Sequence, residues 1–131
     1  MANRVVADVL APTLMRLEEF PSLEPNWDSY GADPITPLAI RIARRIAECV
    51  TASHMATGLP DLYALHAVPL AHGGVQLEWD TEGQSLEVAI GPDGRLAYLY
   101  VDERGGQPAS QESECATEDV ILGLASRLVE P

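Results

Sequence analysis

The chain has 131 residues and a mass of 14.1 kDa, which is the size of one folded domain. Hydrophobic residues make up 47% of it, well above the range of disordered chains. Twenty acidic residues face eight basic ones, all arginine, so the formal net charge is -12. A surface this negative repels phosphate backbones, which argues against general binding to DNA or RNA. We expect a single domain over 1–131.

The cysteines and the apolar segments indicate in which cellular compartment the protein is expected. Cys49 and Cys115 stand far apart and match no zinc-binding or disulfide-rich spacing, so we expect two reduced thiols in or near the core. The apolar stretch 5–15 is interrupted by Asp8 and Pro12, unlike the centre of a signal peptide. No segment approaches the roughly 20 apolar residues that cross a bilayer. We therefore expect a cytoplasmic protein.

The N-terminal part predicts a first helix over about 12–20. Proline at its first position is suitable, because the missing N–H has no helical partner there. Leu14 and Leu17 share one face, which Leu10 joins if the helix extends back. Pro21 ends the segment.

A proline-rich connection follows over 21–37, with two large aromatic residues among turn-forming residues. In one interpretation Trp27 and Tyr30 pin this loop onto the body, each burying about 150–250 Å². In the other, the loop displays Asp28, Tyr30 and Asp33 to a partner.

The second predicted helix is the clearest amphipathic segment of the chain. Thr36 is suited to cap it and Pro37 to begin it, and Gly58 follows its expected end at about Thr57. The apolar positions recur every four residues and define a buried stripe: Leu38, Ile42, Ile46 and Val50.

The opposite face of this helix carries three of the eight arginines: Arg41, Arg44 and Arg45. They either form an ordinary solvated face or meet carboxylates, on the acidic sheet or on a second copy of the protein. A homodimer is therefore one of the open alternatives.

From Leu62 to Val101 the hydrophobic period changes to two, which predicts β-strands. A short connection containing Gly83 joins two alternating segments into a hairpin. Closing it symmetrically brings apolar residues together in three pairs: Trp79 with Leu86, Leu77 with Val88, and Val75 with Ile90. A turn over 91–94 then sets Ile90 opposite Leu96, Val88 opposite Tyr98, and Leu86 opposite Tyr100.

The remaining elements complete the predicted fold. A strand over Leu62 to Pro69 precedes the hairpin, a Gly/Pro/Ser/Gln-rich loop covers 105–113, and a helix follows from about Thr117 to Val129. Its expected buried stripe is Val120, Ile121, Leu124 and Leu128. We predict an α+β domain in the order α-α-β-β-β-β-α: two N-terminal helices, a four-stranded antiparallel meander and one C-terminal helix.

The predicted pairing places Glu78 opposite Glu87 on the other face of the sheet, with Gln76 beside them and Asp80 further along. Like charges across two strands are mildly destabilising. Three interpretations remain open: a solvated carboxylate ladder, a surface for a basic partner, or an acid–base pair or cation site. We find no histidine at a matching strand position, no phosphate-binding loop and no nucleophile motif. We therefore predict no catalytic residue, no metal site and no cofactor.

An apolar patch accompanies these carboxylates on the outer side of the sheet: Ala89, Ala97, Leu99 and Val101. An apolar centre with a charged rim is typical of protein interfaces. The N-terminal segment of the same chain is an alternative cover for it. The three histidines fit no metal-binding spacing; we expect His54 at the polar end of the second helix, His66 in a strand and His72 in a glycine-flanked loop.

Two segments resemble a family of small uncharacterised bacterial and phage proteins. They are Asn26-Trp27-Asp28-Ser29-Tyr30-Gly31-Ala32 with Pro34-Ile35, and Gly73-Gly74-Val75-Gln76-Leu77-Glu78-Trp79. Members of the family have glycine at the position of Ser29, and the resemblance covers roughly 20–102. It implies a prokaryotic or mobile-element origin, where small acidic proteins serve as antitoxins, immunity factors or inhibitors, and it implies no catalytic residue.

The sequence thus favours a non-enzymatic interaction protein that binds another protein, with a basic surface, through its acidic sheet face or its aromatic loop. The candidate partner-binding residues are Asp28, Tyr30, Asp33, Gln76, Glu78, Asp80 and Glu87. Two alternatives remain: a DNA mimic that inhibits a nuclease or nucleic-acid-binding protein, as anti-CRISPR proteins do, and a small enzyme using Glu78 and Glu87. We expect no direct contact with nucleic acid or membrane.

Overall fold

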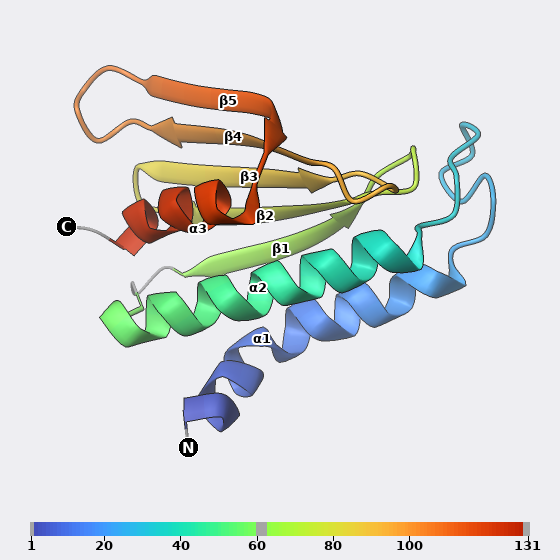
Figure 1. Cartoon of the computed structure of the whole chain (residues 1–131), viewed down its shortest axis with the longest axis horizontal. Helices are drawn as coiled ribbons and strands as arrows, with labels where there is room; N and C mark the ends of the chain where they lie inside the picture. Colours follow the sequence, from blue (N-terminus) through green and yellow to red (C-terminus); the bar gives the residue numbers. More distant parts are fainter. Residues whose placement is uncertain (1, 60–62, 130–131) are drawn as a thin grey trace.

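The computed structural model describes residues 2–59 and 63–129 of the chain. A five-stranded antiparallel sheet has helices against one of its faces (Figure 1). The helices are α1 (Ala2–Glu19), α2 (Pro37–Thr57) and α3 (Glu118–Ser126), with short 3₁₀ turns at Phe20–Ser22 and Arg127–Val129. The strands are β1 (Ala64–Pro69), β2 (Val75–Thr81), β3 (Gln84–Ile90), β4 (Leu96–Asp102) and β5 (Ala109–Ala116).

The predicted α+β class and antiparallel meander are confirmed, because the strands lie in the order β1-β2-β3-β4-β5. The prediction of four strands is wrong. The fifth, β5, occupies much of the segment where we expected a loop over 105–113. Its side chains are almost all polar, so it shows none of the apolar alternation by which the other strands were recognised. Backbone pairing with β4 forms it instead.

The hairpin registers are confirmed at all six apolar pairs that we predicted. Trp79 is the largest side chain of the core and is only 1% exposed, while its neighbour Glu78 lies on the opposite face of β2. Val75 and Leu77 are fully buried beside it. The alternation along β2 and β3 therefore separates a buried inner face from a partly exposed outer face.

The first helix begins at Ala2, not at Pro12, and Pro12 lies inside it. A proline within a helix removes one backbone hydrogen bond and bends the helix, at a cost of about 3 kcal/mol. Figure 1 shows that α1 changes direction along its length. Burial of Leu10 and Leu17 on the same face offsets that cost, since both are at most 2% exposed.

The second helix runs from Pro37 to Thr57 as predicted. The Thr36 hydroxyl accepts the N–H of Ala39 at 3.2 Å, and Gly58 ends the helix with a φ of 93°. Its buried stripe is rotated from the one we expected, because Leu38 and Ile42 are only half-buried. The residues that face the core are Ala39, Ala43, Ile46, Ala47, Val50, Thr51 and His54.

His54 is not at the polar end of the helix but is fully buried. Its Nε2 lies 2.7 Å from the carbonyl oxygen of Ala125, so this nitrogen carries the proton and donates. Its Nδ1 accepts from the Tyr63 hydroxyl at 3.1 Å. The imidazole thus joins α2 to α3 and to the chain just before β1. Burial lowers the pKa of His54, and the hydrogen bond to Ala125 opposes this shift in part.

The C-terminal helix is close to the prediction. The Thr117 hydroxyl caps it by accepting the N–H of Val120 at 3.3 Å. Val120 itself is 44% exposed, so its expected place in the buried stripe is wrong. The side chains that do reach the core are Ile121, Leu124, Ala125 and Leu128.

The two cysteines are free thiols, as expected, but they do not lie in the core. Both are exposed, because Cys49 falls on the polar face of α2 and Cys115 on β5. The first predicted strand is shorter than expected: β1 begins at Ala64, and Leu62 lies outside the described residues. No helix within 2–59 and 63–129 combines the length and apolar character needed to cross a bilayer.

Candidate protein-interaction face

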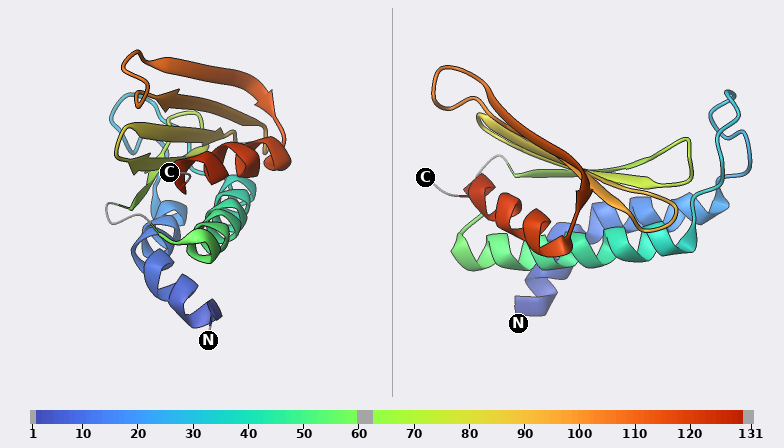
Figure 2. Two further views of the ribbon diagram at one scale, coloured as in Figure 1. Left: turned by 90° about the vertical axis from the view of Figure 1, so that its left-hand side faces the viewer. Right: turned by 45° about the horizontal axis from the view of Figure 1, so that its top comes forward.

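The face of the sheet turned away from the helices, here called the outer face, has no other element of the described chain over it (Figure 2). The N-terminal segment does not cover it, because α1 packs on α2 and β1 instead. The predicted apolar patch is on this face and is half-buried. Its members are Ala89, Ala97, Leu99 and Val101.

The antiparallel registers align one row of side chains across the whole outer face. The row runs through all five strands: His66, Glu78, Glu87, Leu99 and Glu112. Adjacent strands are about 4.8 Å apart, so the carboxylates of Glu78 and Glu87 are near neighbours, whereas Leu99 lies between Glu87 and Glu112. Glu78 lies directly opposite Glu87, as predicted. The Gln76 amide donates to the Glu78 carboxylate at 3.0 Å.

The sequence analysis missed two outer-face glutamates and one histidine. Glu112 and Glu114 belong to β5, whose polar composition had indicated a loop. His66 lies in a strand as predicted, but its position opposite Glu78 is new, because the sequence pattern indicated no register between β1 and β2. The statement that no histidine matches the carboxylates is therefore wrong.

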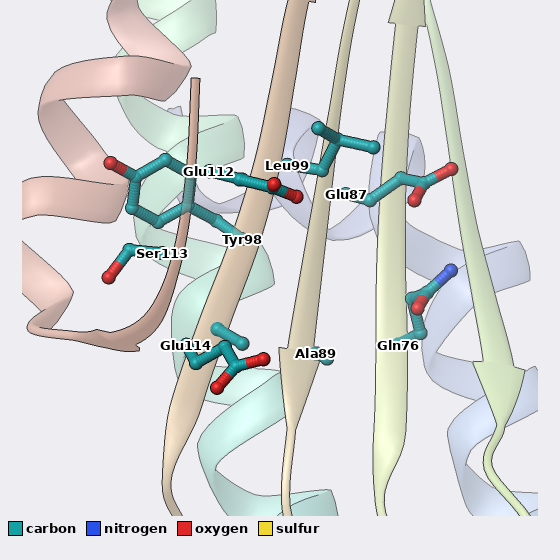
Figure 3. Close-up of a pocket in the computed structure, with 9 residues that line it drawn as sticks. Gln76, Glu87, Ala89, Tyr98, Leu99, Glu112, Ser113 and Glu114 are labelled. Carbon is teal, nitrogen blue, oxygen red and sulfur yellow. The ribbon is translucent and has the colours of Figure 1, made fainter. Parts of the chain in front are cut away.

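A shallow hollow of about 440 Å³ lies between β3, β4 and β5 on this face (Figure 3). Ala89, Ala97 and Leu99 contribute its apolar surface. The carboxylates of Glu87, Glu112 and Glu114 stand around it, as Figure 3 shows. An apolar centre with charged side chains around it is the arrangement that protein interfaces commonly show.

In the described part of the chain, none of the ion pairs joins an arginine to Glu78, Glu87, Glu112 or Glu114. Four ion pairs are present in the described parts of the chain, and all lie elsewhere: Arg16–Glu19, Arg44–Glu48, Arg45–Glu118 and Arg104–Asp102. Among the described residues, no ion pair with arginine thus offsets the negative charge of these four glutamates.

The arginines of α2 do not reach the sheet carboxylates. Arg44 pairs with Glu48 on the same helix at 3.0 Å. Arg45 makes two hydrogen bonds to the Glu118 carboxylate, at 2.9 and 3.0 Å, and so links α2 to the start of α3. Arg41 is exposed. Two of the three predicted arginines therefore meet carboxylates of the same chain, but on helices rather than on the sheet.

The aromatic loop satisfies parts of both interpretations. Trp27 is half-buried against the core, and its indole N–H donates to the Asp33 carbonyl at 2.8 Å. Tyr30, by contrast, is 92% exposed and pins nothing. The Asp28 carboxylate accepts the N–H groups of Tyr30 and Ala32, at 2.8 and 3.1 Å. Asp28 therefore shapes the loop from within, and of the three predicted residues Tyr30 and Asp33 are the exposed ones.

Backbone strain is present in this loop. Asn26 and Ser29 have φ values of 65° and 66°, in the left-handed region that favours glycine. The Asn26 side chain accepts the N–H of Gly31 at 2.6 Å and stabilises the turn. A glycine at the position of Ser29 would adopt this positive φ without strain.

The described residues do not form a recognisable metal centre. No group of three or more histidine, cysteine, aspartate or glutamate side chains in 2–59 and 63–129 is arranged to hold a metal ion. Gln76, Glu78, Asp80 and Glu87 come together on the outer face, whereas Asp28, Tyr30 and Asp33 lie in the separate aromatic loop.

Comparison with protein-family models, curated proteins and solved structures finds no match to this chain. The resemblance to the bacterial and phage family accordingly stays a prediction. The class that the fold itself defines is an α+β domain with one helix-covered and one open face on an antiparallel sheet.

Proposed function

We propose that this protein acts by binding another protein, and that the outer face of its sheet receives a basic surface of that partner. The observation that carries the proposal is the row of Glu78, Glu87 and Glu112 around Leu99, unpaired with any arginine of the described chain. Protein surfaces normally intersperse both signs of charge. Arginine or lysine side chains from a partner would supply the missing charge.

The direct pairing of two glutamates supports a binding role over a purely structural one. Like charges opposite each other destabilise a sheet by some tenths of a kcal/mol. Sites that are costly to stability are often retained for function. Inhibitors, antitoxins and immunity proteins act by binding over the functional surface of a partner protein. We propose that this protein belongs to that group.

The apolar part of the face favours a protein partner over DNA mimicry. A DNA mimic needs carboxylates in continuous rows, whereas here Leu99 interrupts the row and Ala89 and Ala97 lie beside it. Apolar side chains at the centre of an acidic surface suit a partner that offers apolar and basic side chains together.

The experiment is a comparison of charge-reversal variants in capture of the partner from the native host. Glu78→Arg/Glu87→Arg changes the outer face. Glu18→Arg/Glu24→Arg makes the same change in net charge at two exposed positions away from the sheet, one in α1 and one in the proline-rich connection that follows it. We expect the partner to be captured by the wild type and the control but lost from the outer-face variant and at raised salt. Equal capture by both variants would remove the outer face as the binding surface.

A further inference from the structure

The outer face ends at an open strand edge. β5 comes last in the sheet order, and in the described chain no strand pairs with its other side. An unpaired edge presents a row of backbone N–H and C=O groups to any strand that approaches. Natural sheets usually protect such edges, so it matters whether β5 is protected.

The opposite edge of the sheet, β1, is protected in two ways. Pro69 has no N–H to donate, and α1 lies beside the strand, where the Thr13 hydroxyl donates to the Leu65 carbonyl at 3.4 Å. β5 has neither device. It is 8 residues long, contains no proline and is exposed along most of its length. A register shift between the pairs Leu96–Ala116 and Tyr98–Ser113 interrupts it near its end, where the Ser113 hydroxyl accepts the Cys115 N–H at 3.1 Å, so the regular edge is the part that precedes this shift.

We propose that β5 takes an extended, basic segment of the partner protein as an added strand of the sheet. This inference rests on the proposed function and names the form of its partner. Main-chain hydrogen bonds to the edge hold such a strand, and side chains at alternate positions provide specificity. Alternate side chains of the added strand fall on the outer face, beside Glu112 and Glu114.

Charge decides which strand is accepted. Glu112 and Glu114 both border the hollow of the outer face and have no ion-pair partner in the described chain. Cross-strand neighbours of opposite charge stabilise a sheet, and those of like charge destabilise it. An incoming segment with arginine or lysine at every second position therefore meets opposite charge at each of these two glutamates.

The same charges disfavour a second copy of this chain as the occupant. Suppose that β5 pairs with β5 of a second copy about a twofold axis, with both outer faces on the same side of the joint sheet. In each register that pairs nearly the whole strand, Glu112 then lies opposite a glutamate of the second copy. Each copy also has a net charge of -12. The two glutamates thus act against self-association while they favour a basic strand.

The test uses a peptide of the length of β5, 8 residues, with arginine and valine alternating. Two versions are N-methylated on the backbone, one at the arginines and the other at the valines, so that charge and side chains stay the same. A strand that pairs with an edge uses only every second N–H. We expect one version to bind full-length protein roughly tenfold or more weakly than the parent, and the other to bind like the parent.

Calorimetric titration measures these affinities, and hydrogen exchange of the β5 amides gives a second readout, with protection expected on binding. Glu112→Gln/Glu114→Gln should weaken the parent peptide several-fold, and Glu18→Gln/Glu24→Gln, which removes the same charge elsewhere, should not. Equal affinities of the two methylated versions would overturn the proposal that a strand adds to β5. A dimer of the protein formed through β5, with its mass measured by light scattering, would overturn it as well. If the peptide fails in this way while Glu78→Arg/Glu87→Arg still abolishes partner capture, the outer face stands and only the strand-addition inference is lost.

Discussion

Glu78 and Glu87 lie directly opposite each other on β2 and β3, with Trp79 and Leu86 paired one position along on the buried face. The same register thus pairs the largest side chain of the core with Leu86 and sets a like-charge pair outside it. A one-residue slip would bury the glutamates and expose Trp79, so the buried pair holds the two carboxylates together.

The first prediction concerns this repulsion. Glu87→Lys places opposite charges across the two strands and should raise the free energy of unfolding by about 0.2–1 kcal/mol. Glu82→Gln, in the exposed hairpin turn, serves as the control and should change it by less than about 0.5 kcal/mol. Urea denaturation at low salt measures both. A destabilised Glu87→Lys variant would show that the two carboxylates do not repel each other in the folded state.

The second prediction concerns pH. His54 is buried and neutral in the folded protein, and its pKa is lowered by burial, so the unfolded chain binds the proton more readily. The contribution of His54 is therefore fully present above the unfolded pKa of about 6.5 and is lost as the pH falls towards the folded pKa. Denaturation at a series of pH values should show this decline in the wild type.

Protonation of the twenty acidic residues also alters stability in acid, so the comparison is made between variants. His54→Leu should lower the free energy of unfolding at neutral pH by roughly 1–3 kcal/mol, because the Ala125 carbonyl loses its donor and the Tyr63 hydroxyl keeps only its contact with Thr51. The difference between wild type and His54→Leu should narrow as the pH falls below about 6.5. A difference between wild type and His54→Leu that stays constant with pH would contradict the account.

The third prediction concerns two glycines of opposite environment. A Cβ at Gly74 would overlap the carbonyl oxygen of Ile90, where β2 begins against β3. Gly74→Ala should therefore destabilise the protein by about 2 kcal/mol or more. Gly123 lies in α3 with no neighbouring atom near its Cβ position, and Gly123→Ala should stabilise by about 0.5–1 kcal/mol. Thermal unfolding of both variants checks the opposite signs.

The fourth prediction concerns the aromatic loop. Ser29 has a φ of 66°, so Ser29→Gly should relieve strain and stabilise the protein, or leave it unchanged, within about 1 kcal/mol. Tyr30→Ala removes a side chain that is 92% exposed and should alter stability by less than about 0.5 kcal/mol. Calorimetric melting of the two variants tests this. A marked loss from Tyr30→Ala would mean that the tyrosine packs on the body after all.

Much of the fold follows from hydrophobic spacing alone. Alternation in β2, β3 and β4 predicts the registers because each core-facing residue has one apolar partner, as Trp79 has in Leu86. Thr36 and Gly58 mark the ends of α2 because their local chemistry matches helix caps. These features depend on neighbours in sequence or on one simple pairing rule.

The features that the sequence missed depend on tertiary contacts. β5 forms by backbone pairing with β4 and has little apolar side-chain pattern, so Glu112 and Glu114 remained hidden in an expected loop. His54 is buried because α3 and Tyr63 satisfy both ring nitrogens, which the pattern of α2 does not indicate. Pro12 suggested a helix start by its local chemistry, and only the packing of Leu10 in the core decides that the helix continues before it.

The most direct measurement is a map of backbone amide resonances of the isotope-labelled protein as its partner is added. We predict that the largest shifts fall on the outer-face residues of β2 to β5, such as Gln76, Glu87, Leu99 and Glu112, and decline as salt is raised. Shifts concentrated on the exposed side of α2, around Arg41 and Arg44, with the outer face unchanged would contradict the account.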